Sequence, residues 1–130
     1  MVMIKLWVQR RRPNFYELCG FNHTTKQCTA NLKRIREANF SFPSGHSSLV
    51  CCAMTFLVWY LHGARKSSST HHCHSRTNLW SRISSLIITY LPLAWALFVA
   101  ASRLVDQWHH PSDVIAGLGL GFVTCTIAYH

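Results

Sequence analysis

Acidic residues and charged residues in general are scarce in this chain of 130 residues. Only four residues are Asp or Glu, against thirteen Lys or Arg, and charged residues make up 13% of the chain. Soluble proteins carry roughly 25%. The segments 47–61, 83–101 and 114–129 contain no charged residue at all. Three such segments leave too little polar surface for a soluble fold, so we predict a protein that crosses a membrane several times.

The lengths of the uncharged segments predict helices. A spanning helix needs about 20 apolar residues, with a range of roughly 17–25. Segment 83–101 meets this length, whereas the other two are slightly short and, taken alone, would also suit buried core helices. The chain shows no strand-like alternation. We therefore predict an all-α fold, a polytopic transmembrane helical bundle with about three spanning helices over 46–62, 83–101 and 114 onward.

A net charge of +9 raises the possibility of nucleic-acid binding. The basic residues lie between the apolar segments and do not form one patch, so we expect a membrane and no nucleic acid as partner. Polar residues fill two connecting stretches, 10–42 and 63–82. Gly117 and Gly121 form a GxxxG pattern in the third span, which favours close packing of helices.

The six cysteines are too few and too scattered for a disulfide scaffold. Cys19 and Cys28 share the polar stretch 10–42, and they can pair if that stretch faces an oxidising compartment. The sequence "HHCH" at 71–74 has the residue types of a metal site, but it has no second ligand cluster nearby. We interpret it as part of a polar loop and predict no metal site.

Topology places distant polar stretches on one side of the membrane. If the first span crosses and the second returns, residues 43–46 and 102–113 lie on the same face, and "RRRP" at 10–13 joins them. The distribution of basic residues does not decide which face this is. Two glycosylation sequons begin at Asn22 and Asn39, and their use would make the face lumenal or extracellular. Asn22 is the better candidate, because Asn39 lies close to the membrane.

Polar groups suited to an anion lie in each of these stretches: Lys5, Arg12 and Pro13; Ser44, Gly45 and His46; Ser102, Arg103, His109, His110 and Asp113. Arginine donates in a planar fork that matches phosphate oxygens. Gly45 allows the backbone to approach an anion, and the helix expected to begin near His46 directs its free N–H groups toward it. The pattern predicts a phosphate site. Ser44 also suits a purely structural role as a helix N-cap.

His109 and Asp113 are four residues apart. Pro111 suits the first turn of the following helix, which would place Asp113 within reach of the His109 ring. A carboxylate bound to one ring nitrogen fixes the tautomer and makes the other nitrogen a better nucleophile. Asp113 would equally suit a simple capping role at the helix N-terminus, and the spacing does not separate these two interpretations.

Three motifs carry a family resemblance. "K-x6-R-P" from Lys5 to Pro13, "P-S-G-H" at 43–46 and "S-R-x5-H-x3-D" from Ser102 to Asp113 resemble the signature motifs of the type 2 phosphatidic acid phosphatase (PAP2) superfamily. Their flanks resemble its eukaryotic lipid phosphate phosphatase branch. The resemblance covers about residues 5–125. It implies one phosphatase domain over 1–130, incomplete at its N-terminus and equivalent to the C-terminal part of a six-helix fold.

The resemblance also implies an activity: magnesium-independent hydrolysis of lipid phosphomonoesters such as phosphatidate, without a cofactor. By this resemblance His109 attacks phosphorus, His46 protonates the leaving group and then activates water, and Asp113 orients His109. The phosphoryl oxygens would be held by a second set: Lys5, Arg12, Ser44, Gly45 and Arg103. The loop 10–42 would be lumenal or extracellular and the loop 63–82 cytosolic, in the plasma membrane or the endoplasmic reticulum and Golgi, with homo-oligomers possible.

Two alternatives stay open. One is a truncated, non-catalytic membrane homologue that binds lipid or a partner protein, and the other is a different phosphatase of the same superfamily. The first motif also departs from the family pattern, because "QRRRP" is more basic than the usual glycine-containing version. We expect this difference to affect phosphate affinity or headgroup preference.

Overall fold

The computed structural model describes residues 2–69 and 78–129. Within these residues the chain is mainly helical with almost no sheet, which confirms the all-α prediction. The helices are α1 (Val2–Val8), α2 (Phe15–Cys19), α3 (Leu32–Ala38), α4 (Gly45–Ser69), α5 (Leu79–Val105) and α6 (Pro111–Tyr129). One short antiparallel hairpin joins β1 (Phe21–Asn22) to β2 (Gln27–Cys28).

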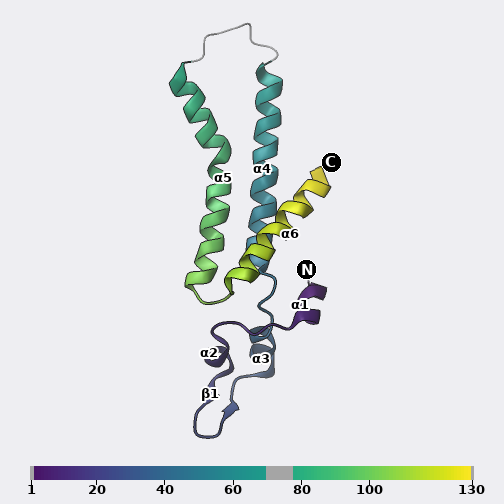
Figure 1. Ribbon diagram of the computed structural model, residues 1–130, viewed down its shortest axis with the longest axis vertical. Coiled ribbons are helices and arrows are strands. Elements are labelled where there is room, and N and C mark those ends of the chain that lie inside the picture. Colours follow the sequence, from purple (N-terminus) through teal and green to yellow (C-terminus); the bar gives the residue numbers. More distant parts are fainter. Residues whose placement is uncertain (1, 70–77, 130) are drawn as a thin grey trace.

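Three helices are long and apolar enough to cross a membrane: Gly45–Lys66 within α4, and the whole of α5 and α6. Helices α4 and α5 lie side by side, and α6 crosses α4 obliquely near the start of both α4 and α6 (Figure 1). Each predicted span lies inside one of these helices. The chain is therefore a helical, multi-pass membrane protein.

The spanning helices are longer than the uncharged segments that predicted them. Helix α4 continues to Ser69 and α5 begins at Leu79, so much of the expected linker 63–82 is helical. Ala, Arg and Lys at 64–66 are good helix formers. Arg65 also donates to Thr89 Oγ1 at 2.8 Å and so ties α4 to α5. The "HHCH" stretch at 71–74 lies outside the described residues.

The GxxxG glycines set the contact between α6 and α4. A Cβ atom on Gly117 would lie 2.5 Å from the carbonyl oxygen of Ser44, and one on Gly121 would overlap the carbonyl oxygen of Ser48. A Cβ atom on Gly119 would meet nothing within 4 Å. Gly117 and Gly121 therefore let α6 approach the first turns of α4 closely.

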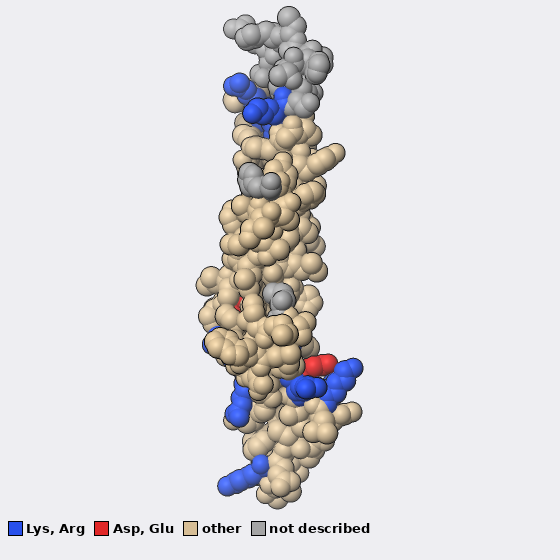
Figure 2. All heavy atoms as spheres, turned by 90° about the vertical axis from the view of Figure 1, so that its right-hand side faces the viewer, with Lys and Arg blue, Asp and Glu red and all other residues tan. Residues whose placement is uncertain are grey.

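The surface of the long helices is apolar between two charged ends. Lys and Arg gather toward both ends of the face in Figure 2, and the stretch between them is almost free of charge. The spanning helices expose large hydrophobic side chains, among them Phe56, Leu91 and Ile115. So wide an exposed apolar surface marks contact with lipid or with another protein in the membrane.

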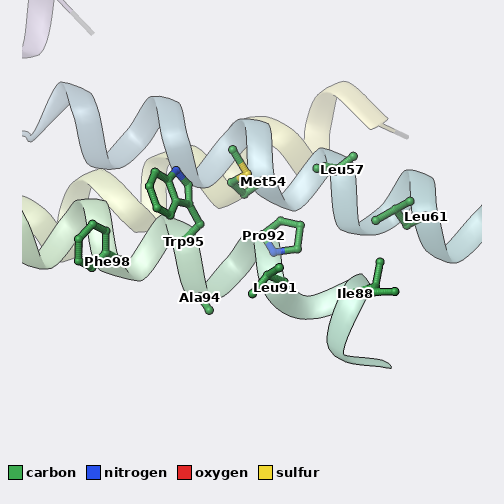
Figure 3. A pocket seen from close by; sticks show the side chains of 9 residues that line it. All are labelled: Met54, Leu57, Leu61, Ile88, Leu91, Pro92, Ala94, Trp95 and Phe98. Carbon is green, nitrogen blue, oxygen red and sulfur yellow. The ribbon is translucent and has the colours of Figure 1, made fainter. Parts of the chain in front are cut away.

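An apolar groove opens between α4 and α5 inside this uncharged stretch. It has a volume of about 780 Å³ and is lined by Met54, Leu57 and Leu61 of α4 and by residues around Pro92 and Trp95 of α5 (Figure 3). Pro92 cannot donate an intrahelical hydrogen bond. At this level of the span, α4 and α5 leave an apolar opening between them.

The expected polar loop 10–42 is folded. It contains α2, the hairpin and α3, and a disulfide joins Cys19 to Cys28. Gly20 ends α2 in the left-handed conformation, with φ of 60°, which glycine adopts readily. This small unit lies at the same end of the molecule as the start of α4 (Figure 1). It holds the N-terminal motif against the beginning of that helix.

Candidate functional site

Backbone hydrogen bonds bring the three motif-bearing stretches together. The N–H of Arg12 donates to the carbonyl of Ala38 at 2.9 Å, and the N–H of Ser41 donates to the carbonyl of Arg10 at 2.9 Å. The N–H of Ser44 then donates to the carbonyl of Asp113 at 3.0 Å. The N-terminal motif, the start of α4 and the start of α6 thus meet at one end of the bundle.

Asp113 lies at the centre of this junction and is fully buried. Its Oδ1 accepts from Arg10 Nη1 at 2.6 Å, and its Oδ2 accepts from the Ser41 hydroxyl and, at 3.0 Å, from the N–H of His110. A buried carboxylate needs such donors to offset its loss of hydration. Of the two interpretations that the spacing left open, the bond to the His110 N–H fits capping at the start of α6, and the described hydrogen bonds of Asp113 do not include the His109 ring.

The ring of His109 is held by a different acceptor. The side chain is only 4% exposed, and its Nδ1 lies 2.7 Å from the carbonyl oxygen of Ser41. A carbonyl oxygen only accepts hydrogen bonds, so Nδ1 must carry the proton. The lone pair of neutral His109 is therefore on Nε2, which is the arrangement that a nucleophilic imidazole requires.

The surroundings of His109 keep it neutral. The pKa of His109 is lowered to about 4; burial is the largest cause, and the positive charges of Arg12 and Lys5 act in the same direction. The hydrogen bond to Ser41 and the charge of Asp113 act in the opposite direction. The imidazole is consequently unprotonated at neutral pH.

Lys5 and Arg12 supply positive charge beside the histidine. The Lys5 Nζ lies 3.8 Å from the point where a Cβ on Gly45 would stand. Burial and the charge of Arg12 both lower the pKa of Lys5. Two half-buried cations this close repel each other, so an anion between them would be stabilised.

The Arg12 side chain is itself fixed by its neighbours. It stacks over the ring of Trp108 at 4.6 Å, and its Nε donates to the carbonyl of Glu37 at 3.1 Å. Burial lowers the pKa of Arg12, and Glu37 opposes that change. The guanidinium is thus held in place before any ligand binds.

Ser44 makes the hydrogen bonds of an N-cap. It is buried, and its Oγ accepts from the N–H of Ser47 at 3.5 Å and from the Ser47 hydroxyl at 2.9 Å. Gly45 begins α4 and His46 is exposed on its first turn. The free N–H groups and positive dipole end of α4 therefore lie beside Lys5.

Arg103, the remaining predicted phosphate ligand, bonds within its own segment. Its Nη2 pairs with Asp106 Oδ2 at 3.1 Å, and both Nε and Nη2 donate to the Ser102 hydroxyl at 3.2 Å. The Nε2 atom of His110 lies 3.2 Å from the carbonyl oxygen of Arg11. The described contacts thus join Lys5, Gly45, Ser44, His109 and Asp113, while those of Arg103 stay at the end of α5.

Arg10 and Ser41 were not among the predicted site residues. Arg10 belongs to a run of three arginines, and the run alone does not show which one meets a carboxylate. Ser41 acts on His109 through its backbone carbonyl, a group that every residue possesses and that leaves no signal in the sequence.

Comparison with known proteins identifies the family of this chain. The family model of the PAP2 superfamily matches residues 1–130. Over 134 residues the chain is 34% identical to the probable lipid phosphate phosphatase 4 of Arabidopsis thaliana, covering 97% of this chain and 41% of that protein. Lipid phosphate phosphatase 2 of the same organism is also 34% identical, with 97% of this chain and 43% of that protein covered.

A human protein is similar as well. Phospholipid phosphatase 2 of Homo sapiens is 30% identical over 135 residues, covering 96% of this chain and 43% of that protein. The chain thus spans about two fifths of the length of these relatives. No solved structure matches it. A family match along the whole chain shows that this protein belongs to the PAP2 superfamily.

Proposed function

We propose that this chain carries the reaction site of a phosphatase that hydrolyses lipid phosphomonoesters such as phosphatidate. The observation that carries the proposal is His109, a buried neutral imidazole whose Nδ1–H is held by a carbonyl and which lies near Lys5 and Arg12. Relatives named lipid phosphate phosphatase and phospholipid phosphatase support a lipid substrate. The apolar helices behind the site would let the acyl chains stay in the bilayer.

The reaction would have two steps. In the first, His109 Nε2 attacks phosphorus, the bond from phosphorus to the lipid oxygen breaks, and protonated His46 gives its proton to the departing alkoxide. In the second, His46 takes a proton from water, and the resulting hydroxide attacks phosphorus. The bond to His109 breaks, inorganic phosphate leaves, and His46 is again protonated.

Fixed positive groups would stabilise the charge of both transition states. Lys5 and Arg12 are held near the start of α4, where Gly45 leaves the backbone open to a phosphoryl oxygen. Ser44 and Arg103 complete the proposed phosphate-binding set. Because these groups already supply positive charge, we propose that the reaction proceeds without magnesium.

We also propose that the site faces the lumen or the cell exterior. The disulfide between Cys19 and Cys28 supports an oxidising compartment for the segment 10–42. The connection between α4 and α5 would then be cytosolic. The whole chain acts as one domain in this proposal, because the folded segment 10–42 contributes the backbone that holds the first motif.

Phosphate release from phosphatidate in mixed micelles, with EDTA present, tests the proposal. We expect His109→Ala to abolish turnover and His46→Ala to lower kcat by about 10²–10⁴-fold, the range for loss of a general acid–base. Radiolabelled substrate should trap a phosphoenzyme in the parent chain and none in His109→Ala. His23→Ala, in the exposed hairpin, serves as the matched control and should leave kcat unchanged. Turnover that requires a divalent metal, or that survives His109→Ala, contradicts the mechanism.

A further inference from the structure

Ser41 makes hydrogen bonds to three parts of the junction. It is fully buried, and all three of its polar groups are used. Its N–H donates to the carbonyl of Arg10, its carbonyl accepts from His109 Nδ1, and its hydroxyl donates to Asp113 Oδ2. A single residue therefore joins the first motif to both His109 and Asp113 of the third motif.

Hydrogen bonds connect the carboxylate of Asp113 to the His109 ring through Ser41. Its Oδ1 is held by Arg10, whose Nη1 also donates to the Ser112 hydroxyl at 2.6 Å. Its Oδ2 is held by Ser41 and by the N–H of His110. The connected groups thus form one chain, Arg10 to Asp113 to Ser41 to the His109 ring.

We propose that Ser41 is a positioning residue that couples Asp113 to His109, an inference that rests on the proposed function. The hydroxyl bond to Asp113 fixes the rotation of the Ser41 peptide unit. The orientation of that unit sets where its carbonyl oxygen stands, and the oxygen sets the direction of the His109 ring. Asp113 thereby orients the nucleophile through a serine and a peptide group, without touching the imidazole.

Small errors in this alignment have large consequences. Misplacing a reacting group by about 1 Å can lower a rate on the order of 10²-fold. The described contacts of Lys5, Arg12 and Gly45 do not involve the Ser41 hydroxyl, so substrate binding should be largely independent of it. A loss of the hydroxyl should therefore lower kcat and spare KM.

Kinetics of Ser41→Ala and Ser41→Thr in the complete chain test the proposal. We expect Ser41→Ala to lower kcat and the rate of phosphoenzyme formation by about 10–100-fold, with KM changed less than about 2-fold. Ser41→Thr keeps the hydroxyl and should restore most of the rate. Thr55→Val removes another buried hydroxyl of the bundle, outside the junction, and should leave kcat unchanged.

A double-mutant cycle separates coupling from mere stabilisation. If Ser41 acts through Asp113, the rate of Ser41→Ala combined with Asp113→Asn should equal that of Asp113→Asn alone. Additive losses, an unchanged kcat in Ser41→Ala, or an effect on KM alone would overturn the proposal. Thermal unfolding reports whether each variant folds. If Ser41→Ala does not fold, Ser41→Cys replaces it, because a thiol is a weaker hydrogen-bond donor than a hydroxyl.

A measurement without substrate distinguishes this proposal from the proposed function. Correlated proton and nitrogen-15 spectra of the histidine rings show which nitrogen carries the proton, and His109→Ala assigns the signal. The parent chain should show the Nδ1–H form at His109, and Ser41→Ala should show a mixture of both tautomers. A parent chain without turnover would defeat the proposed function only, whereas an identical His109 signal in Ser41→Ala would defeat the role of Ser41.

Discussion

The three consecutive arginines at 10–12 have three different partners. Arg10 pairs with Asp113, Arg11 stacks over the ring of Phe15 at 5.0 Å, and Arg12 stacks over Trp108. Of these three arginines, only Arg12 is a cause that lowers the pKa of His109; Lys5 lowers it as well. The unusually basic first motif therefore divides its charge between holding Asp113 and shaping the surroundings of the imidazole.

The pKa of His109 predicts the pH dependence of phosphoenzyme formation. The imidazole is neutral above about pH 4 and loses its nucleophilic lone pair as the pH falls through that value. The acid limb of the rate should therefore lie near pH 4, well below the ordinary histidine value of about 6.5. Rapid-quench measurements of phosphoenzyme over a pH series provide the test.

Arg12→Gln is the informative variant for this profile. The positive charge of Arg12 disfavours protonation of His109. Removing this charge should raise the pKa of His109 and move the acid limb to higher pH. Ionisation of the substrate is the same in both proteins, which means that the difference between the profiles reports on the enzyme. An acid limb that stays in place in Arg12→Gln would show that this charge does not act on the histidine.

At the scale of the helices, the approach of α6 to α4 positions the site. Gly117 and Gly121 let α6 pack closely against the first turns of α4. There the Ser44 N–H donates to the Asp113 carbonyl. Helix packing and site geometry are thus set by the same contact. A change that separates the two helices should also displace Asp113 from Ser41.

Gly117→Val tests this link between packing and activity. The new side chain would collide with the Ser44 carbonyl oxygen, and overpacking of this kind costs about 1–3 kcal/mol. We expect a lower Tm in detergent and a loss of phosphatase activity. Gly119→Val is the matched control, because its position is open, and it should change neither quantity appreciably. Equal effects of the two substitutions would refute the packing argument.

At the scale of the whole molecule, the charged ends and the apolar middle define an orientation. The disulfide-closed segment, the first motif and the starts of α4 and α6 all lie at one end (Figure 1). The end of α4 and the start of α5 lie at the other end (Figure 1). Knowing which compartment either end faces therefore also tells which compartment the site faces.

Glycosylation of Asn22 tests the proposed orientation. Asn22 is exposed on the hairpin, so a lumenal segment would be modified in a eukaryotic host. We expect a glycosidase-sensitive mobility shift that Asn22→Gln removes. Asn39→Gln should not alter the shift, because the Asn39 side chain is half-buried and donates to the carbonyl of Ile35 at 2.9 Å. If the chain is not glycosylated and Asn22 is found on the cytosolic side, the proposed orientation is wrong.

The sequence by itself determined the helical membrane architecture and the meeting of the three motifs. Uncharged segments of this length form helices in a bilayer because only a helix satisfies every backbone group there. Crossing and returning then place residues 10–13, 43–46 and 102–113 on one face. The folded segment 10–42 was not foreseen, because its short elements depend on a disulfide and on contacts with the rest of the chain.

Only the tertiary structure decided the partners within the site. The spacing of His109 and Asp113 was compatible with direct contact, yet the start of α6 turns the carboxylate toward the His110 N–H, and Arg10 and Ser41 complete its shell. His109 then bonds to a peptide carbonyl, a group common to every residue. Such a choice depends on where the chain places its backbone in space, and residue types along a sequence carry no record of that position.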